Sequence, residues 1–246
     1  MDIFYTADMQ KLTFKELFNL SPSKFMFPLF YFLKLIGYFN KPTTIFKTPF
    51  RMIRKQEEEL PSNAMELLNT RLFSFKNDFR KVFCFVGPVN LGDDFFPGMI
   101  LLNSDRTILA MMIYIDYFKH SPTNPKTNEV KIALFTRTID GEMIITSNSK
   151  PDFKGPPWVK GEYIKASDAE MIERHKIRLQ INAMRSFISF PEHDIENIMH
   201  DYEKRVFEFQ LQRGLYRILE PHEIEPLLKL KGKQTEDQSY NSTRNP

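Results

Sequence analysis

Cysteine and glycine are both scarce in this sequence of 246 residues, which has one Cys and nine Gly. The single cysteine, Cys84, cannot form an intramolecular disulfide, so a disulfide-stapled secreted domain is excluded and a cytoplasmic location is expected. Classical zinc modules need several Cys and His residues at short spacing and are excluded as well. The few glycines argue against a glycine-rich phosphate loop. No cofactor motif is found, and we expect no bound cofactor.

Net charge is also small, because 34 Lys and Arg oppose 31 Asp and Glu to give +3. This balance predicts no nucleic-acid partner. The charge is uneven, however. Residues 1–55 contain nine Lys and Arg against three Asp and Glu, a net of +6, so the rest of the chain sums to −3. The same residues contain 13 aromatic side chains, out of 24 Phe, 9 Tyr and 1 Trp in the whole chain.

Long apolar runs are absent, and so are the features of a signal peptide. The first ten residues carry two Asp and no basic residue, which is not the start of a secretory signal. The most apolar stretch, residues 25–39, has 15 residues and includes Lys34. A spanning helix needs about 17–25 apolar residues. The stretch therefore predicts a buried or interfacial helix that starts near Pro28, and a spanning helix is the less favoured alternative.

The pattern of apolar residues predicts an α+β fold. Helical spacing recurs in residues 11–20, 28–39, 56–77, 167–187 and 191–211. Runs rich in β-branched and aromatic residues occur at 81–89, 99–102, 107–118, 130–139 and 142–147, and more weakly at 163–166. Asp140-Gly141 is typical of a tight hairpin turn. We expect an antiparallel meander of about five strands, covered by helices, with a capping box at Ser167 and Glu170.

Composition divides the chain into three parts. We expect residues 1–55 to form an aromatic and basic helical arm and residues 60–230 to form the α+β domain. Residues 231–246 have almost no apolar content and predict a disordered tail.

The arm carries the strongest functional signal. Phe and Tyr rings favour a bilayer interface, and Lys and Arg are attracted to anionic headgroups. Lys34 could extend from its apolar helix toward those headgroups. Alternatively, the helix covers an open face of the sheet. The residues expected to contact a membrane or protein partner are Phe25, Phe27, Phe30, Tyr31, Phe32, Lys34, Tyr38, Phe39, Arg51, Arg54 and Lys55.

A weaker candidate is a ligand-binding or catalytic site on the Asp140-Gly141 hairpin. Paired residues of antiparallel strands share a face, and such a polar face could bind an anion. The residues of this candidate site are Thr136, Arg137, Thr146, Asn148 and, on a nearby helix, His175. Ordinary strand surface and a structural histidine remain the alternatives, because no nucleophile or orienting carboxylate is identifiable.

One helix carries a run of potential metal ligands, namely His193, Glu196, His200 and Glu203. At 100° per residue this run lies opposite the apolar stripe that starts at Ile195. Ligands of a bundle metal site point inward, so we interpret the run as a solvated face and expect no metal. The apolar stripe could serve a core or a homodimer.

The sequence thus favours a non-enzymatic binding or scaffolding protein, attached peripherally to an anionic membrane surface or a protein partner through its arm. A small-ligand-binding protein or enzyme that uses the hairpin and His175 is the alternative.

Overall fold

The computed structural model describes residues 4–21, 24–38, 46–47, 52–88, 95–116, 128–151 and 153–228. These residues form two compact units. Unit 1 contains the described residues between 4 and 47 together with 203–228, and unit 2 contains those between 52 and 202. The predicted tail at 231–246 lies outside the described residues. Composition alone does not anticipate that residues 203–228 join the N-terminal segment.

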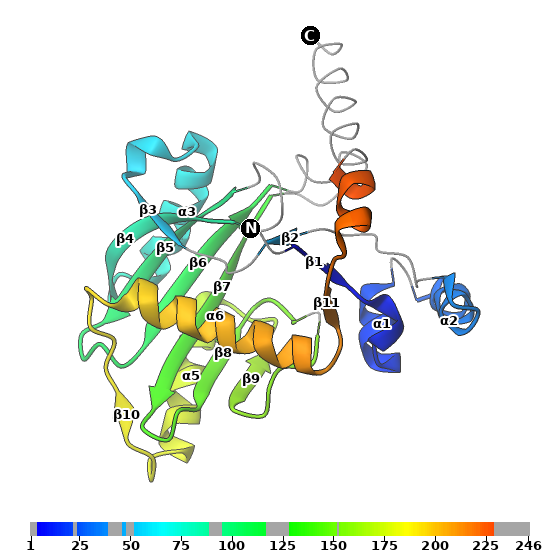
Figure 1. Cartoon of the computed structure of the whole chain (residues 1–246). Coiled ribbons are helices and arrows are strands. Elements are labelled where there is room, and N and C mark those ends of the chain that lie inside the picture. The colour runs from blue at the N-terminus through cyan, green and yellow to red at the C-terminus, as the bar shows by residue number, and fades with distance from the viewer. Residues whose placement is uncertain are drawn as a thin grey trace. The chain divides into compact units, whose positions relative to one another are not determined.

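Unit 2 is built on one large sheet with the strand order β3-β4-β5-β6-β7-β8-β9, while β10 pairs with β7 (Figure 1). Neighbouring strands are antiparallel except β8 and β9, which are parallel. The strands are β3 (Ile53–Lys55), β4 (Phe79–Pro88), β5 (Phe95–Asn103), β6 (Leu109–Ile115), β7 (Glu129–Thr138), β8 (Met143–Ser147), β9 (Val159–Tyr163) and β10 (Phe187–Ile188).

The α+β class is confirmed, whereas the expected number of about five strands is too low for this sheet of eight. β3 and β10 have only three and two residues, too few to show the alternation that predicts a strand, and in β9 a glycine occupies the middle of the apolar side. The meander also ends at β8. A parallel partner needs a connection that crosses back along the sheet, and the chain makes this crossing between β8 and β9.

The hairpin between β7 and β8 forms at the predicted turn. Arg137 pairs with Met143, and the Gly141 N–H donates to the Thr138 carbonyl at 3.1 Å. Gly141 has φ +82°, a conformation that favours glycine because it has no Cβ. This turn fixes which residues of the two strands lie opposite each other.

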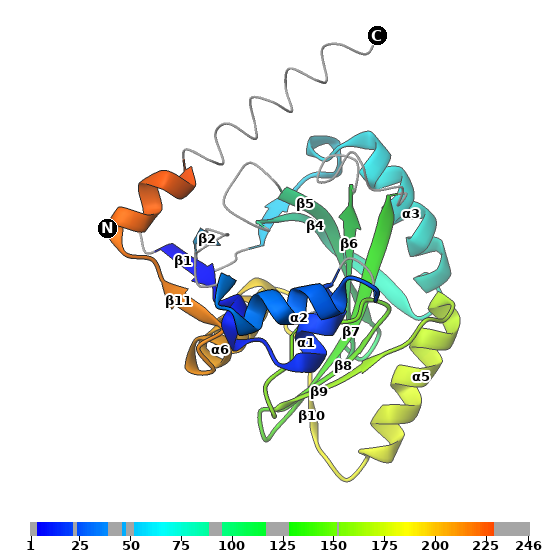
Figure 2. The same ribbon diagram turned by 90° about the vertical axis from the view of Figure 1, so that its right-hand side faces the viewer.

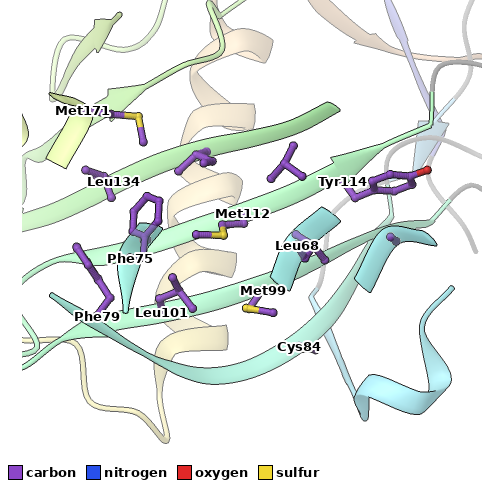
Figure 3. Packing of buried hydrophobic residues seen from close by; sticks show 14 of the residues in the cluster. Leu68, Phe75, Phe79, Cys84, Met99, Leu101, Met112, Tyr114, Leu134 and Met171 are labelled. Carbon is purple, nitrogen blue, oxygen red and sulfur yellow. The ribbon is translucent and has the colours of Figure 1, made fainter. Parts of the chain in front are cut away.

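Alternation along β6 and β7 sends side chains to both faces of the sheet. On one face, α3 (Ser62–Phe75) and α5 (Asp168–Ile181) cover a core that includes Leu68, Met112 and Leu134 (Figure 3). A short 3-10 helix, η3 (Glu57–Glu59), precedes α3. α5 starts at the predicted capping box, but it ends at Ile181 rather than continuing to residue 187.

The opposite face packs against the start of α6 (Ile195–Gln212), which crosses it in Figure 1. Ile195 and Met199 are buried there with Phe135. Tyr202 meets both Phe135 and Trp158 edge to face, with ring centroids 5.8 Å apart in each pair. Both sheet faces of unit 2 therefore have their own helical cover.

Unit 1 joins segments that are far apart in the sequence. Its small sheet has the order β11-β1-β2. The strands and helices before residue 48 are β1 (Phe4–Ala7), the 3-10 helix η1 (Met9–Lys11), α1 (Phe14–Leu20), α2 (Phe27–Leu35) and β2 (Phe46–Lys47). The unit is completed by the end of α6, β11 (Tyr216–Ile218) and the helical residues 221–228.

Candidate interaction surface

Glu16, the only acidic residue of α1, holds this helix in place within unit 1. Thr13 and Glu16 form a capping box, in which the Thr13 N–H donates to Glu16 Oε2 at 2.8 Å. Glu16 is buried, and its two carboxylate oxygens lie 2.8 and 3.0 Å from Arg213 Nη2. The capping box and the ion pair hold the negative charge of α1 inside unit 1, away from the surface.

α2 packs on α1 through aromatic rings, and Figure 2 shows the two helices side by side. Phe27 meets Phe14 and Phe18 edge to face, with ring centroids 4.6 and 5.1 Å apart. Tyr31 also meets Phe14, at 5.5 Å. Edge-to-face pairs of this kind add to the stabilisation that area burial provides. The ammonium of Lys34, one turn further along, donates to a backbone carbonyl, that of Leu12.

The opposite side of α2 is exposed. At 100° per residue, Phe27, Tyr31 and Lys34 share one face of the helix. Four other side chains share the opposite face. Phe25 lies just before the helix, Leu29 and Phe32 lie in it, and Ile36 follows it. Their exposed fractions are 95%, 51%, 57% and 59%. We call these four residues the outer face of α2. No residue of the helix is buried.

Exposed charge in the segment that carries α1 and α2, positions 9–38, has a single sign. Lys11, Lys15 and Lys24 are all exposed. Glu16 is the only acidic residue between positions 9 and 38, and it is buried against Arg213. An apolar surface on a segment whose exposed charges are all lysines attracts anionic groups and offers them apolar area to bury.

The predicted contact residues separate into two groups. Phe25, Tyr31, Phe32 and Tyr38 are exposed, whereas Phe27 and Phe30 are half-buried. Arg54 and Lys55 belong to β3 of unit 2 and form ion pairs there, with Glu196 at 2.9 Å and Glu59 at 2.7 Å. Phe39 and Arg51 lie outside the described residues.

The direction of the Lys34 side chain differs from the sequence expectation, because its ammonium reaches back to Leu12, between η1 and α1, instead of outward. The sequence pattern could not reveal this direction, because the partner is a carbonyl 22 residues away in the chain.

The candidate ligand site on the hairpin brings together three of its five predicted residues. Thr136 Oγ1 donates to the Thr107 carbonyl at 3.0 Å, so its oxygen accepts from His175 Nε2, also at 3.0 Å. The other ring nitrogen, Nδ1, then accepts from the Thr146 hydroxyl at 2.9 Å. Thr146 in turn accepts from Arg178 Nη1 at 2.9 Å. We call this series of bonds the His175 chain.

The His175 chain fixes a neutral imidazole with its proton on Nε2. Burial, and to a lesser extent the positive charge of Arg178, lower the pKa of His175 to about 3. A second proton on the ring would also leave the Thr146 hydroxyl without its acceptor. Thr136, Thr146 and His175 are all fully buried, so the chain attaches α5 to β7 and β8 and presents nothing to solvent.

The other two predicted ligand residues lie apart from this chain. The Arg137 guanidinium sits over the Phe190 ring at 4.9 Å, on the face of the sheet that α6 covers. Asn148 bonds to the edge of β7, where its Oδ1 accepts from the Ile132 N–H at 2.8 Å. The structure therefore does not assemble the five residues around a common point.

The run of potential metal ligands from His193 to Glu203, which we interpret as a solvated face, begins just before α6. His193 is exposed, and Glu196 is paired with Arg54. Within the described ranges, no group of three or more His, Cys, Asp or Glu side chains could hold a metal ion.

Among the helices in the described part of the chain, none combines the length and apolar character needed to cross a bilayer.

Comparison of the chain with protein-family models, with curated proteins and with solved structures finds no match.

Proposed function

We propose that this chain is a non-enzymatic binding protein that docks onto its target through the outer face of α2. The observation that carries the proposal is the exposure of Phe25, Leu29, Phe32 and Ile36 on one side of a helix whose other side is held by α1. Single exposed apolar residues are ordinary on protein surfaces. A contiguous set, carried on a braced helix, is typical of an interaction site.

The bracing of α2 favours docking over a structural role. Phe27, Tyr31 and Lys34 hold the helix on α1, so the outer face is presented in a fixed orientation. A preorganised surface loses less conformational entropy on binding than a mobile one. Burying a Phe, Leu or Ile side chain contributes about 1.5–3 kcal/mol, so four such residues offer substantial affinity.

The ligand-binding or enzymatic alternative receives no comparable support. Its central residue, His175, is fully buried, and its two ring nitrogens are engaged by threonine hydroxyls. A general base must reach the proton it abstracts, either directly or through one water.

Photo-crosslinking tests the docking proposal without assuming what the target is. The photo-reactive amino acid p-benzoylphenylalanine replaces Phe32 in the full chain, in cells that produce it. The matched control carries it at Phe73, which is similarly exposed but lies on α3 of unit 2. We expect adducts to lipid or protein at position 32 that are absent at position 73. Equal or no adduct formation at the two positions would refute the proposal.

A further inference from the structure

We infer that the target of α2 is the interface of an anionic lipid bilayer, in which the helix lies parallel to the membrane plane. This inference rests on the proposed docking function and specifies its partner. Three observations carry it: the charge around the helix, the width of its apolar surface and its length.

The charge around α2 matches an anionic surface. Lys11, Lys15 and Lys24 are exposed, and the one carboxylate in this part of the chain, that of Glu16, is buried against Arg213. Anionic lipid attracts basic residues that lie close to the headgroups, and no exposed acidic side chain between positions 9 and 38 opposes that attraction.

The apolar surface of α2 is wider than a protein groove requires. A helix that binds a groove uses one stripe at i, i+3, i+4 and i+7, and its remaining surface stays polar. In α2, Pro28 and Leu35 are exposed and lie next to the outer face at 100° per residue, and the only charged residue of the helix, Lys34, is directed to Leu12. A broad uncharged arc fits the continuous apolar medium of a bilayer better than a narrow stripe on a partner.

The length of α2 decides its orientation. Nine residues at 1.5 Å each extend only about 14 Å, less than half of the roughly 30 Å hydrocarbon core. The helix is therefore too short to span, and burying the outer face requires it to lie flat. Helices with Phe and Leu on one side and Lys along the edge bind membranes in this way. Tyr38, three residues beyond the helix, is exposed and suits the headgroup level.

Vesicle flotation with the full-length protein tests the inference. The probes are phosphatidylcholine vesicles with and without phosphatidylglycerol, at low and at high salt. We expect binding to the anionic vesicles to be at least about tenfold tighter than to the zwitterionic ones, and to weaken as salt screens the lysines.

Variants test whether vesicle binding depends on the outer face of α2 and on the lysines. The triple variant L29S/F32S/I36S should lose binding to both kinds of vesicle, whereas K15Q/K24Q should lose only the preference for anionic lipid. The matched control I181S/M184S replaces two exposed apolar residues of unit 2 and should bind as the unaltered protein does. All changes are on exposed side chains, and circular dichroism verifies that each variant is folded.

The possible failures are distinguishable. If vesicles of neither kind bind, and the photo-reactive group at position 32 links to a protein, the lipid inference is overturned while the docking function stands. If position 32 forms no specific adduct and vesicles do not bind, both are overturned. Equal binding to the two kinds of vesicle, or binding by the serine variant, contradicts the anionic-bilayer inference.

Discussion

His175 shows how a single buried residue acquires a fixed protonation state. The Thr107 carbonyl can only accept a hydrogen bond, and Arg178 can only donate one, so the direction of every bond in the His175 chain is determined. His175 is buried on α5 together with Met171 and Ile172. The bonds to Thr136 and Thr146 depend on how α5 lies across the sheet, which no local pattern encodes.

The pH dependence of stability tests this description. The unfolded histidine has a pKa near 6.5 and the folded one a pKa of about 3, so between these values the unfolded state binds more protons. Stability is therefore present above pH 6.5 and is lost as the pH falls below it. Between pH 7 and pH 5 we expect a loss of about 2 kcal/mol in the free energy of unfolding from this residue.

The measurement is urea denaturation of the protein and of His175→Gln at both pH values. The variant lacks the titrating ring. Between pH 7 and pH 5, its free energy of unfolding should therefore fall by about 2 kcal/mol less than that of the unaltered protein. Taking the difference cancels the contribution of other groups, such as Glu203, whose pKa desolvation raises to about 7. His193→Gln, at an exposed position, serves as the control. Parallel pH curves for the protein and His175→Gln would contradict the assignment.

Arg213 is expected to be the most sensitive charged residue of unit 1. Its removal in Arg213→Ala leaves the Glu16 carboxylate buried without its cation. Breaking a buried pair from one side costs about 3 kcal/mol or more. Urea denaturation measures this cost. Lys176→Ala, which removes an exposed partner of Asp78, should cost less than about 1 kcal/mol. A similar small cost for both variants would show that Glu16 is not enclosed as described.

At the scale of the elements, the sheet of unit 2 depends on a close approach at β5. A Cβ added at Gly98 would lie 2.4 Å from Phe85 Cζ and 2.6 Å from the Met112 carbonyl oxygen. Gly98 pairs with Phe85 on β4 and with Ile113 on β6, so neither neighbour can move away freely. A methyl group at this position must displace a ring and a backbone at once.

Gly98→Ala should therefore destabilise the protein by about 1–3 kcal/mol. Gly161→Ala is the matched control, because Gly161 also lies in a strand but has open space where a Cβ would be. The control should change the free energy of unfolding by less than about 0.5 kcal/mol. Thermal or urea denaturation of the two variants measures both changes. An equal effect in both would contradict the close approach of Phe85 and the Met112 carbonyl to Gly98.

The elements that the sequence predicts well are those with a local physical signal. The capping box starts α5 at Ser167, and Asp140-Gly141 makes the β7–β8 turn. Elements with no such signal are missed. β10 has two residues, and β9 pairs with β8 in parallel only because of the crossing that the chain makes between them. Strand pairing of this kind is decided by tertiary packing, which single-sequence patterns do not contain.

The sequence predicts which segment carries the candidate surface, but not which side chains of that segment are exposed. The aromatic and basic excess of residues 1–55 singles out the arm. The rotation of α2 is set by Phe14, Phe18 and the Leu12 carbonyl, and it decides that Phe32 is exposed while Phe27 is not. Arg54 and Lys55 count toward the charge of the arm, yet they form ion pairs inside unit 2.

For the whole molecule, the division into two units follows from long-range contacts. β1 pairs with β11, and Glu16 is bound by Arg213, 197 residues further along the chain. Unit 1 therefore needs both ends of the described chain to form the base that carries α1 and α2. Unit 2 covers both faces of its sheet with α3, α5 and the start of α6.

The most direct test of the account is the position of residue 32 in a membrane. In Phe32→Trp, the new indole belongs to the outer face of α2, and Trp158 provides an unchanged background signal because it packs on Tyr202 in unit 2. We expect vesicles of anionic lipid with brominated acyl chains to quench the added fluorescence of Phe32→Trp, and to leave that of the control Phe73→Trp unchanged. Vesicles that bind the protein but quench neither added indole, or both equally, would contradict insertion through α2.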